Sequence, residues 1–208
     1  MIQTLTVTTA AATRDLTRLA TVKTELSIGD TTQDAWLTDA IRQASDGIAA
    51  YCRRPEGFGR ETVEETFRAR YAGQAVSSLI LGRDIAPAIT SVVEDGTALL
   101  AAEYLLDGSL LRRLEDDRPT SWNAAKIVVV YQAGYTLLSG LPYDVERCAI
   151  DLVVRAYNAR GRDPGLRSER ILDVIAQSWD TPGGDGFKGG LPTDVADRLD
   201  PYRKWVVA

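Results

Sequence analysis

The strongest constraint in this sequence is a change of hydrophobic period, which is helical toward both ends of the chain and strand-like in the middle. Between 34 and 53, apolar residues recur at spacings of three and four, and the same spacing returns between 142 and 160. Such spacings place apolar side chains on one face of a helix. The sequence therefore predicts two long amphipathic helices, whose apolar faces we expect to pack on each other.

The segment between these helices has the two-residue period of β-strands. Apolar and polar residues alternate over 61–71, and 126–131 is a β-branched run. Asp95-Gly96 and Asp107-Gly108 each stand between strand-like runs and predict hairpin turns. We therefore predict a β-meander of five or six short antiparallel strands over 60–135.

Helices on both sides of a strand-rich segment indicate an α+β fold, in which a helical body carries an inserted β-meander. The body combines the two long amphipathic helices with shorter ones. We expect a single domain over 1–208, with N-terminal helices in 13–55, the meander insertion in 60–135 and C-terminal helices in 142–205.

Three segments lie outside these clear patterns. Residues 1–12 are compatible with a short strand or a loose arm, and 168–179 with a helix or an extended segment. The stretch 181–190 contains five glycines and predicts a mobile loop.

Charge and residue types exclude several functional classes. The chain has 24 Lys and Arg against 29 Asp and Glu, a net charge of −5, and phosphate neutralisation dominates nucleic-acid affinity, so a free-standing nucleic-acid binder is disfavoured. The chain has no histidine, which removes histidine-based triads and histidine-ligated zinc. Cys52 and Cys148 lie on apolar helix faces, and we expect free thiols. Without an apolar run of membrane-spanning length or a signal peptide, we expect a soluble protein of a reducing compartment with no membrane partner.

Three patterns that suggest a chemical site have simpler explanations. Gly184, Gly186 and Gly189 have the dinucleotide-binding spacing, but the strand and helix that this motif requires are not indicated around them. Glu115-Asp116-Asp117 is more typical of a solvated turn than of a metal site. Arginines near 53–70 and 155–170 are explained by helix-end charges and intersubunit salt bridges. We predict no catalytic residue, no cofactor and no metal.

Four stretches, in this order, resemble phage head–tail connector (adaptor) proteins. LATVKTELSI, followed by Thr31–Asp34 and LTDAIRQASDGIAAYCRR, is similar to the N-terminal pattern of that family. The others are IAPAITSVVEDGTALLAAEYLLDGSLLRR, then IVVVYQAGY with LPYDVERCAIDLVVRAYNAR, and finally LDPYRKW. The resemblance runs discontinuously over about 13–205, and the sequence departs from the family in the Thr-rich N-terminal arm and the Gly-rich segment.

The resemblance implies a structural virion protein of a tailed phage, a prophage or a phage-derived gene-transfer particle. Such proteins are assembled in the host cytoplasm and form a ring, typically of twelve copies, at the head–tail interface. The implied partners are further copies, the portal protein, a tail-terminator or stopper protein, and genomic DNA that passes without sequence-specific binding. The alternative is a non-viral assembly or regulatory binding module without catalysis.

Two exposed regions are the candidate interfaces of such a ring subunit. One is the outer face of the meander, with Glu64, Arg68 and Arg70. The other is the C-terminal part of the chain, where aromatic residues flank the Gly-rich segment and are compatible with core or interface positions. Its candidate residues are Phe187, Lys188, Tyr202 and Trp205.

Overall fold

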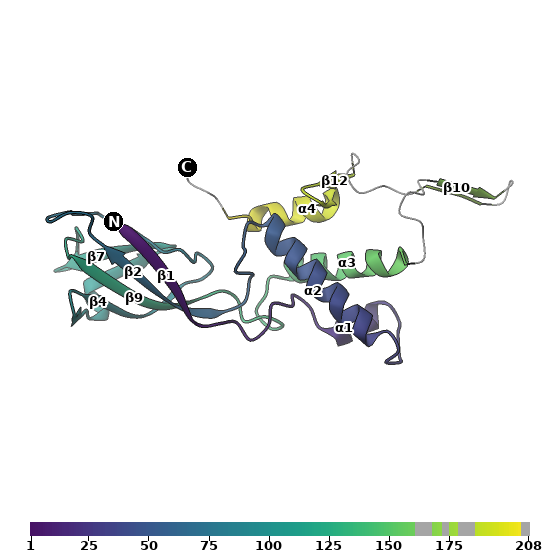
Figure 1. Ribbon diagram of the computed structural model, residues 1–208, viewed down its shortest axis with the longest axis horizontal. Helices are drawn as coiled ribbons and strands as arrows, with labels where there is room; N and C mark the ends of the chain where they lie inside the picture. The colour runs from purple at the N-terminus through teal and green to yellow at the C-terminus, as the bar shows by residue number, and fades with distance from the viewer. Residues whose placement is uncertain (161–167, 172–174, 179–185, 205–208) are drawn as a thin grey trace. The chain divides into compact units, whose positions relative to one another are not determined.

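The computed structural model describes residues 1–160, 168–171, 175–178 and 186–204, with backbone only for the two short middle segments (Figure 1). The chain falls into two compact units. Residues 1–13 and 59–136 form the β unit, and residues 14–58 and 137–208 form the helical unit. The α+β class is confirmed, while the single-domain organisation stays a prediction.

The β unit contains two antiparallel sheets. The five-stranded sheet has the order β1-β2-β9-β4-β5. Its strands are β1 (Ile2–Thr9), β2 (Glu61–Arg68), β9 (Lys126–Ala133), β4 (Ala88–Glu94) and β5 (Thr97–Ala98). The smaller sheet has the order β3-β7-β6, and β8 also pairs with β7. Its strands are β3 (Leu79–Ile80), β7 (Leu110–Glu115), β6 (Tyr104–Asp107) and β8 (Arg118–Thr120), and a 3-10 turn (Ala101–Glu103) precedes β6.

Side chains from both sheets make one buried core. It includes Val63, Phe67, Leu111, Trp122 and Tyr131, each almost or completely inaccessible to solvent. The alternation in β2 and β9 supplies this core from every second residue, as expected for strands with one buried face. The buried Trp122 donates its indole N–H to the carbonyl of Leu111 at 3.1 Å, so its polar group is satisfied.

The strand order differs from the predicted meander. β2 pairs over its full length with β9, from Glu61 opposite Ala133 to Arg68 opposite Lys126, and β1 pairs with the other edge of β2. In a meander, strands pair with their sequence neighbours, and turn signals report only such local pairs. The pairing of β2 with β9 instead joins the two longest strands of the segment, whose buried side chains, among them Val63, Phe67 and Ile127, belong to one core.

The tight turns follow the sequence closely. Asp95 and Gly96 both have positive φ and join β4 to β5 as predicted. The next turn lies one residue later than predicted, at Gly108 and Ser109, because Asp107 pairs with Leu110. Asp116 and Asp117 join β7 to β8, also with positive φ. The predicted turn at the three carboxylates is therefore confirmed.

The helical unit contains both predicted long helices. They are α2 (Asp34–Tyr51) and α3 (Tyr143–Asn158), joined by the shorter α1 (Leu19–Glu25) and α4 (Thr193–Leu199) and by a 3-10 turn (Asp200–Tyr202). Ile41 and Leu37 of α2 share one buried cluster with Ile150 and Val153 of α3. The predicted packing of the two apolar faces is therefore confirmed. In α3, Asp144 and Glu146 occupy the first turn and Arg155 the last, which complements the helix dipole.

The two segments whose structure the sequence left undecided contain strands. Residues 1–12 contain β1, and 168–179 contains the hairpin β10 (Ser168–Ile171) and β11 (Ile175–Ser178). The predicted mobile loop lies partly outside the described residues, at 181–185. Its remainder begins a hairpin of β12 (Phe187–Lys188) and β13 (Leu191–Pro192). Among the described residues, no helix has the length and hydrophobicity that crossing a membrane requires.

Candidate interaction surfaces

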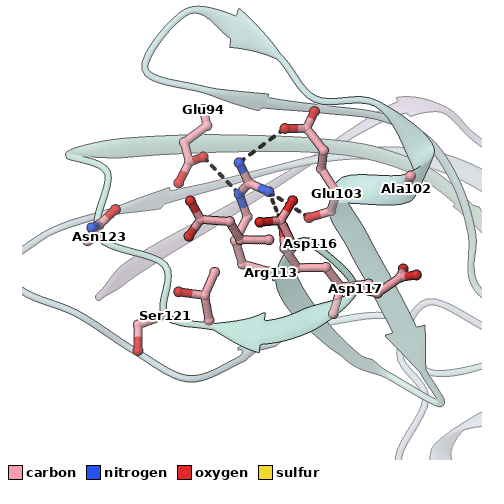
Figure 2. A pocket seen from close by; sticks show the side chains of 11 residues that line it. Glu94, Ala102, Glu103, Arg113, Asp116, Asp117, Ser121 and Asn123 are labelled. Carbon is pink, nitrogen blue, oxygen red and sulfur yellow. Dashed lines mark hydrogen bonds and ion pairs between the residues drawn. The ribbon is translucent and has the colours of Figure 1, made fainter.

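An acidic hollow of about 540 Å³ lies in the β unit between the turns of its smaller sheet. Figure 2 shows the guanidinium of Arg113 between the carboxylates of Glu94, at 3.2 Å, and Glu103, at 3.4 Å. Arg113 also donates to the main-chain carbonyl of Glu103 at 2.8 Å. Glu115, Asp116 and Asp117 add three further carboxylates to the lining. One cation among five carboxylates leaves the hollow negative, a surface that repels nucleic-acid phosphates.

The disfavoured alternative, a metal site at this carboxylate turn, finds no support in its geometry. Within the ranges that the structure describes, no three carboxylate or thiol side chains are grouped closely enough to hold a metal ion. The side chains at Glu115, Asp116 and Asp117 are exposed at the turn between β7 and β8. The hollow therefore provides negative charge but no set of side chains arranged as metal ligands.

The outer face of the five-stranded sheet carries the first group of predicted interface residues. Glu64 and Arg68 are exposed on the same face of β2, because they are separated by an even number of residues. Glu64 lies opposite Thr6, and Arg68 lies opposite Ile2. Arg70 follows the strand and is exposed. The structure thus brings Glu64 and Arg68 together on one surface, and their role as an interface stays a prediction.

The second predicted group lies where the C-terminal segment meets the end of α2. Lys188 contacts Asp197 at 2.9 Å and Asp200 at 2.5 Å, and its hydrogen bond to Asp200, followed by that to Asp197, raises the pKa of this ammonium group. Tyr51 donates its hydroxyl hydrogen to Asp200 at 2.6 Å. The hydrogen bonds from Lys188 and Tyr51 lower the pKa of the Asp200 carboxyl.

Main-chain contacts hold the same segment. Arg54 donates to the carbonyl of Tyr202 at 3.0 Å, and the N–H of Lys204 donates to the carbonyl of Cys52 at 2.9 Å. Tyr202 and Phe187 are half-buried, and Trp205 lies outside the described residues. Lys188 and Tyr202, expected at an interface between subunits, therefore have partners within their own unit.

The glycine motif does not form a phosphate-binding turn in the part that the structure describes. Gly184 lies outside the described residues, and Gly186 begins the β12–β13 hairpin. At Gly189, φ is +60°, and a Cβ atom would lie 2.9 Å from the Tyr51 ring. This glycine is therefore needed for close packing of the hairpin on α2.

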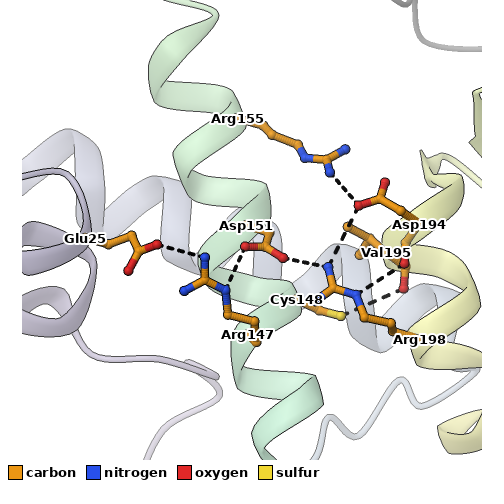
Figure 3. A network of polar contacts seen from close by, with 8 residues as sticks. All are labelled: Glu25, Arg147, Cys148, Asp151, Arg155, Asp194, Val195 and Arg198. Carbon is orange, nitrogen blue, oxygen red and sulfur yellow. Dashed lines mark hydrogen bonds and ion pairs between the residues drawn. The ribbon is translucent and has the colours of Figure 1, made fainter.

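A chain of ion pairs connects three helices of the helical unit (Figure 3). Arg147 of α3 contacts Glu25 of α1 at 2.8 Å and Asp151 at 3.0 Å. Arg198 of α4 contacts Asp151 at 2.6 Å, and the hydrogen bond to Asp151 raises the pKa of Arg198.

The same network explains part of an arginine cluster. Arg155, which belongs to the cluster near 155–170, contacts Asp194 of α4 at 2.5 Å. Arg160 lies 4.6 Å above the ring of Trp36 and 5.4 Å from that of Tyr157. Both arginines therefore have partners within their own chain. The sequence had suggested that these arginines complement helix-end charges or form salt bridges between subunits.

The two cysteines are free and buried, as predicted. Both thiols point to main-chain carbonyls of α4, Cys52 to Leu199 at 3.9 Å and Cys148 to Val195 at 3.8 Å. Burial raises the pKa of each from the usual 9.0 to about 11. Neutral thiols at ordinary pH are structural groups and poor nucleophiles.

Comparison with known proteins identifies the family pattern. Residues 17–79 match the family described as "Phage gp6-like head-tail connector protein". That span begins just before α1 and ends in β3. This is a family of structural connectors, which agrees with the prediction of a non-catalytic protein. No curated protein matches the sequence.

Solved structures match nearly the full length of the chain. A chain in "Neck of native GTA particle computed with C12 symmetry" has a TM-score of 0.55 at 17% identity, covering 99% of this chain and 97% of that one. A chain in "Neck of empty GTA particle computed with C6 symmetry" has a TM-score of 0.53 at 18% identity, covering 99% and 97%. The resemblance that the sequence shows is confirmed: residues 17–79 match the phage gp6-like head-tail connector family, and the fold of the chain is similar to that of these neck chains.

Proposed function

We propose that this protein is a head–tail connector of a tailed phage or a phage-derived gene-transfer particle. It forms a ring beneath the portal protein, extends the DNA channel and gives the tail a docking surface. One observation carries this proposal: the connector family pattern at 17–79 lies within a fold that matches a neck chain over 99% of the sequence. Its place is the head–tail interface of the virion, after assembly in the host cytoplasm.

The symmetry of the similar structures supports a ring of identical copies. The neck of the native GTA particle was computed with C12 symmetry, and twelve copies are the number we propose here. Adjacent copies in a ring meet through two different surfaces of the same chain. The portal protein and a tail-terminator or stopper protein are the proposed neighbours along the axis.

The charge of the chain suits contact with passing DNA. Each copy contributes a net charge of −5, and the hollow around Arg113 is negative. Negative walls repel the phosphate backbone and oppose tight binding. We therefore propose that genomic DNA passes this protein without sequence-specific binding.

Removing the gene from its phage or prophage tests the proposal. The expected particles have filled or DNA-leaking heads without tails, and complementation with the wild-type gene restores the tails. Tailed, infectious particles in the deletion strain would overturn the proposal. Purified chain mixed with purified portal should also produce closed rings in electron micrographs, and the chain without portal serves as the control.

A further inference from the structure

Strand β1 forms an unprotected edge of the five-stranded sheet. No other strand among the described residues pairs with its outer side. Soluble proteins guard edge strands with charges, prolines, bulges or short length, because an open edge pairs with other chains. β1 is eight residues long and lacks charge and proline, and the first charged side chain of the sequence is Arg14. The pairing register of β1 with β2 shifts between Val7 and Thr9, so the pairing is regular from Ile2 to Val7.

The opposite edge of the same sheet is protected. β5 has only two residues, and Pro87 immediately precedes β4. A register shift between Ile89 and Ser91 interrupts β4. Only one edge of this sheet is therefore suited to receive another strand.

Exposed apolar side chains gather along the unprotected edge. Ile2 and Val7 of β1 are 53% and 41% exposed, and Ile80 of β3 is 60% exposed. Ile80 adjoins β1, because Gln3 donates its side-chain amide hydrogen to the Ile80 carbonyl at 3.0 Å. Apolar surface beside unpaired main-chain groups is typical of a sheet edge to which another chain adds a strand. The two backbones then form hydrogen bonds, and the added strand covers every second side chain.

We infer that β1 pairs with β1 of a second copy, antiparallel about a two-fold axis. In an antiparallel pair, side chains that lie opposite each other point to the same face of the sheet, and successive side chains along a strand alternate between the two faces. Even-numbered residues of β1 must therefore lie opposite even-numbered residues of the second copy, and odd-numbered residues opposite odd-numbered ones. A register centred on Leu5 places Leu5 against its own copy, Gln3 against Val7, and Thr4 against Thr6. Cross-strand threonine pairs are favourable, and an uncharged strand does not repel its copy.

This pair is a form of the free protein, distinct from the proposed ring. A two-fold contact uses the same surface on both copies and closes after two, whereas a ring repeats a contact between different surfaces. The β1 pair therefore covers the apolar edge of the free chain. The pairing rests on the edge itself and does not depend on the proposed function.

Sedimentation velocity of the full chain tests the inference. The wild-type protein is expected to shift, with rising concentration, from 22.7 kDa to twice that mass. Thr4→Lys with Thr6→Lys places lysines opposite lysines across the two-fold axis, and this variant is expected to stay monomeric. Thr66→Lys is the matched control, because Thr66 lies opposite Thr4 on β2, one strand inside the edge; it should dimerise like wild type.

Two further measurements keep the test decisive. Far-UV circular dichroism establishes that the lysine variants are folded, and Thr6→Lys alone, which opposes lysine to threonine, should give a dimer of intermediate affinity. Hydrogen exchange of the β1 amides should slow with rising concentration in wild type and in Thr66→Lys, but not in the double-lysine variant. A wild-type protein that is monomeric at every concentration, or a folded double-lysine variant that still dimerises, would overturn the inference, whatever the outcome for tail attachment.

Discussion

Tyr131 of β9 donates its hydroxyl hydrogen to the carboxylate of Glu65 on β2 at 2.9 Å, inside the core of the β unit. Glu65 is completely buried and also accepts from the N–H of Gly82 at 3.1 Å and from the side-chain amide of Gln3. A buried carboxylate is costly unless its oxygens are hydrogen-bonded. The four contributing segments, β1, β2, β9 and the residues after β3, are therefore held around one charge.

Tyr131→Phe is expected to destabilise the β unit. Burial, reinforced by the neighbouring Glu65, raises the pKa of the Tyr131 hydroxyl, so it stays protonated and available as a donor. Removing it leaves a buried carboxylate oxygen without this partner, at a cost of about 1–3 kcal/mol. Urea unfolding measures the effect. Tyr71→Phe is the control, since Tyr71 is 67% exposed; equal stabilities of both variants would contradict the assigned role.

Ile41→Ala should cost about 2–5 kcal/mol, the range for emptying a well-packed aliphatic site. Ile41 is 3% exposed within the cluster of α2 and α3. Leu152→Ala should cost less, because Leu152 packs against this cluster while only partly buried. Denaturation midpoints compare the two variants with wild type. An Ile41→Ala protein with an unchanged midpoint would refute the packing of the two helices.

Local features of this fold were predictable, because periodicity and turn chemistry act over a few residues. The stripe containing Ile41 predicted α2, and Asp95-Gly96 predicted the β4–β5 turn. The pairing of β2 with β9 was missed, because it joins strands about sixty residues apart and no local signal marks it. Glu65 had a signal: it occupies an every-second position between Val63 and Phe67, and a carboxylate there must be buried with partners.

The C-terminal candidates show the same limit. Lys188 and Tyr202 are of residue types that are common at protein interfaces. Sequence alone does not reveal that two aspartates of the same chain pair with Lys188, or that Arg54 binds the carbonyl of Tyr202. The hydrogen bond of Tyr51 to Asp200 spans 149 positions. Long-range contacts of this kind depend on the packing of α2 against the C-terminal segment, which periodicity does not encode.

Thiol reactivity should report the burial of Cys52 and Cys148. With pKa values of about 11, both thiols stay neutral in the native protein at pH 8 and should react slowly with a thiol reagent, whereas both react at once in denaturant. Because folding raises these pKa values, their stabilising contribution is complete below the usual value of 9.0 and is lost as the pH rises toward 11. Fast labelling of native protein at pH 8, or fewer than two thiols in denaturant, would contradict this.

Lys188→Gln should loosen the β12–β13 hairpin. The ammonium group connects this hairpin to Asp197 and Asp200, and glutamine keeps the length and polarity without the charge. Amide exchange between residues 187 and 191 should accelerate, while global stability changes little because the site is solvent-exposed. Lys126→Gln, at the exposed first residue of β9, is the control. Unchanged exchange in Lys188→Gln would show that packing against Tyr51 alone holds the hairpin.

Arg68→Glu should weaken ring formation on the portal if the outer face of β2 is the contact between copies. Arg68 and Glu64 are exposed on that face, and a charge pattern at an interface sets orientation and association rate, so reversing one charge opposes docking. The readout is the fraction of portals that carry a ring in electron micrographs. Arg118→Glu is the matched control, because Arg118 is equally an exposed arginine but lies on β8 of the smaller sheet. Rings at wild-type frequency with Arg68→Glu would remove this face from the candidate interfaces.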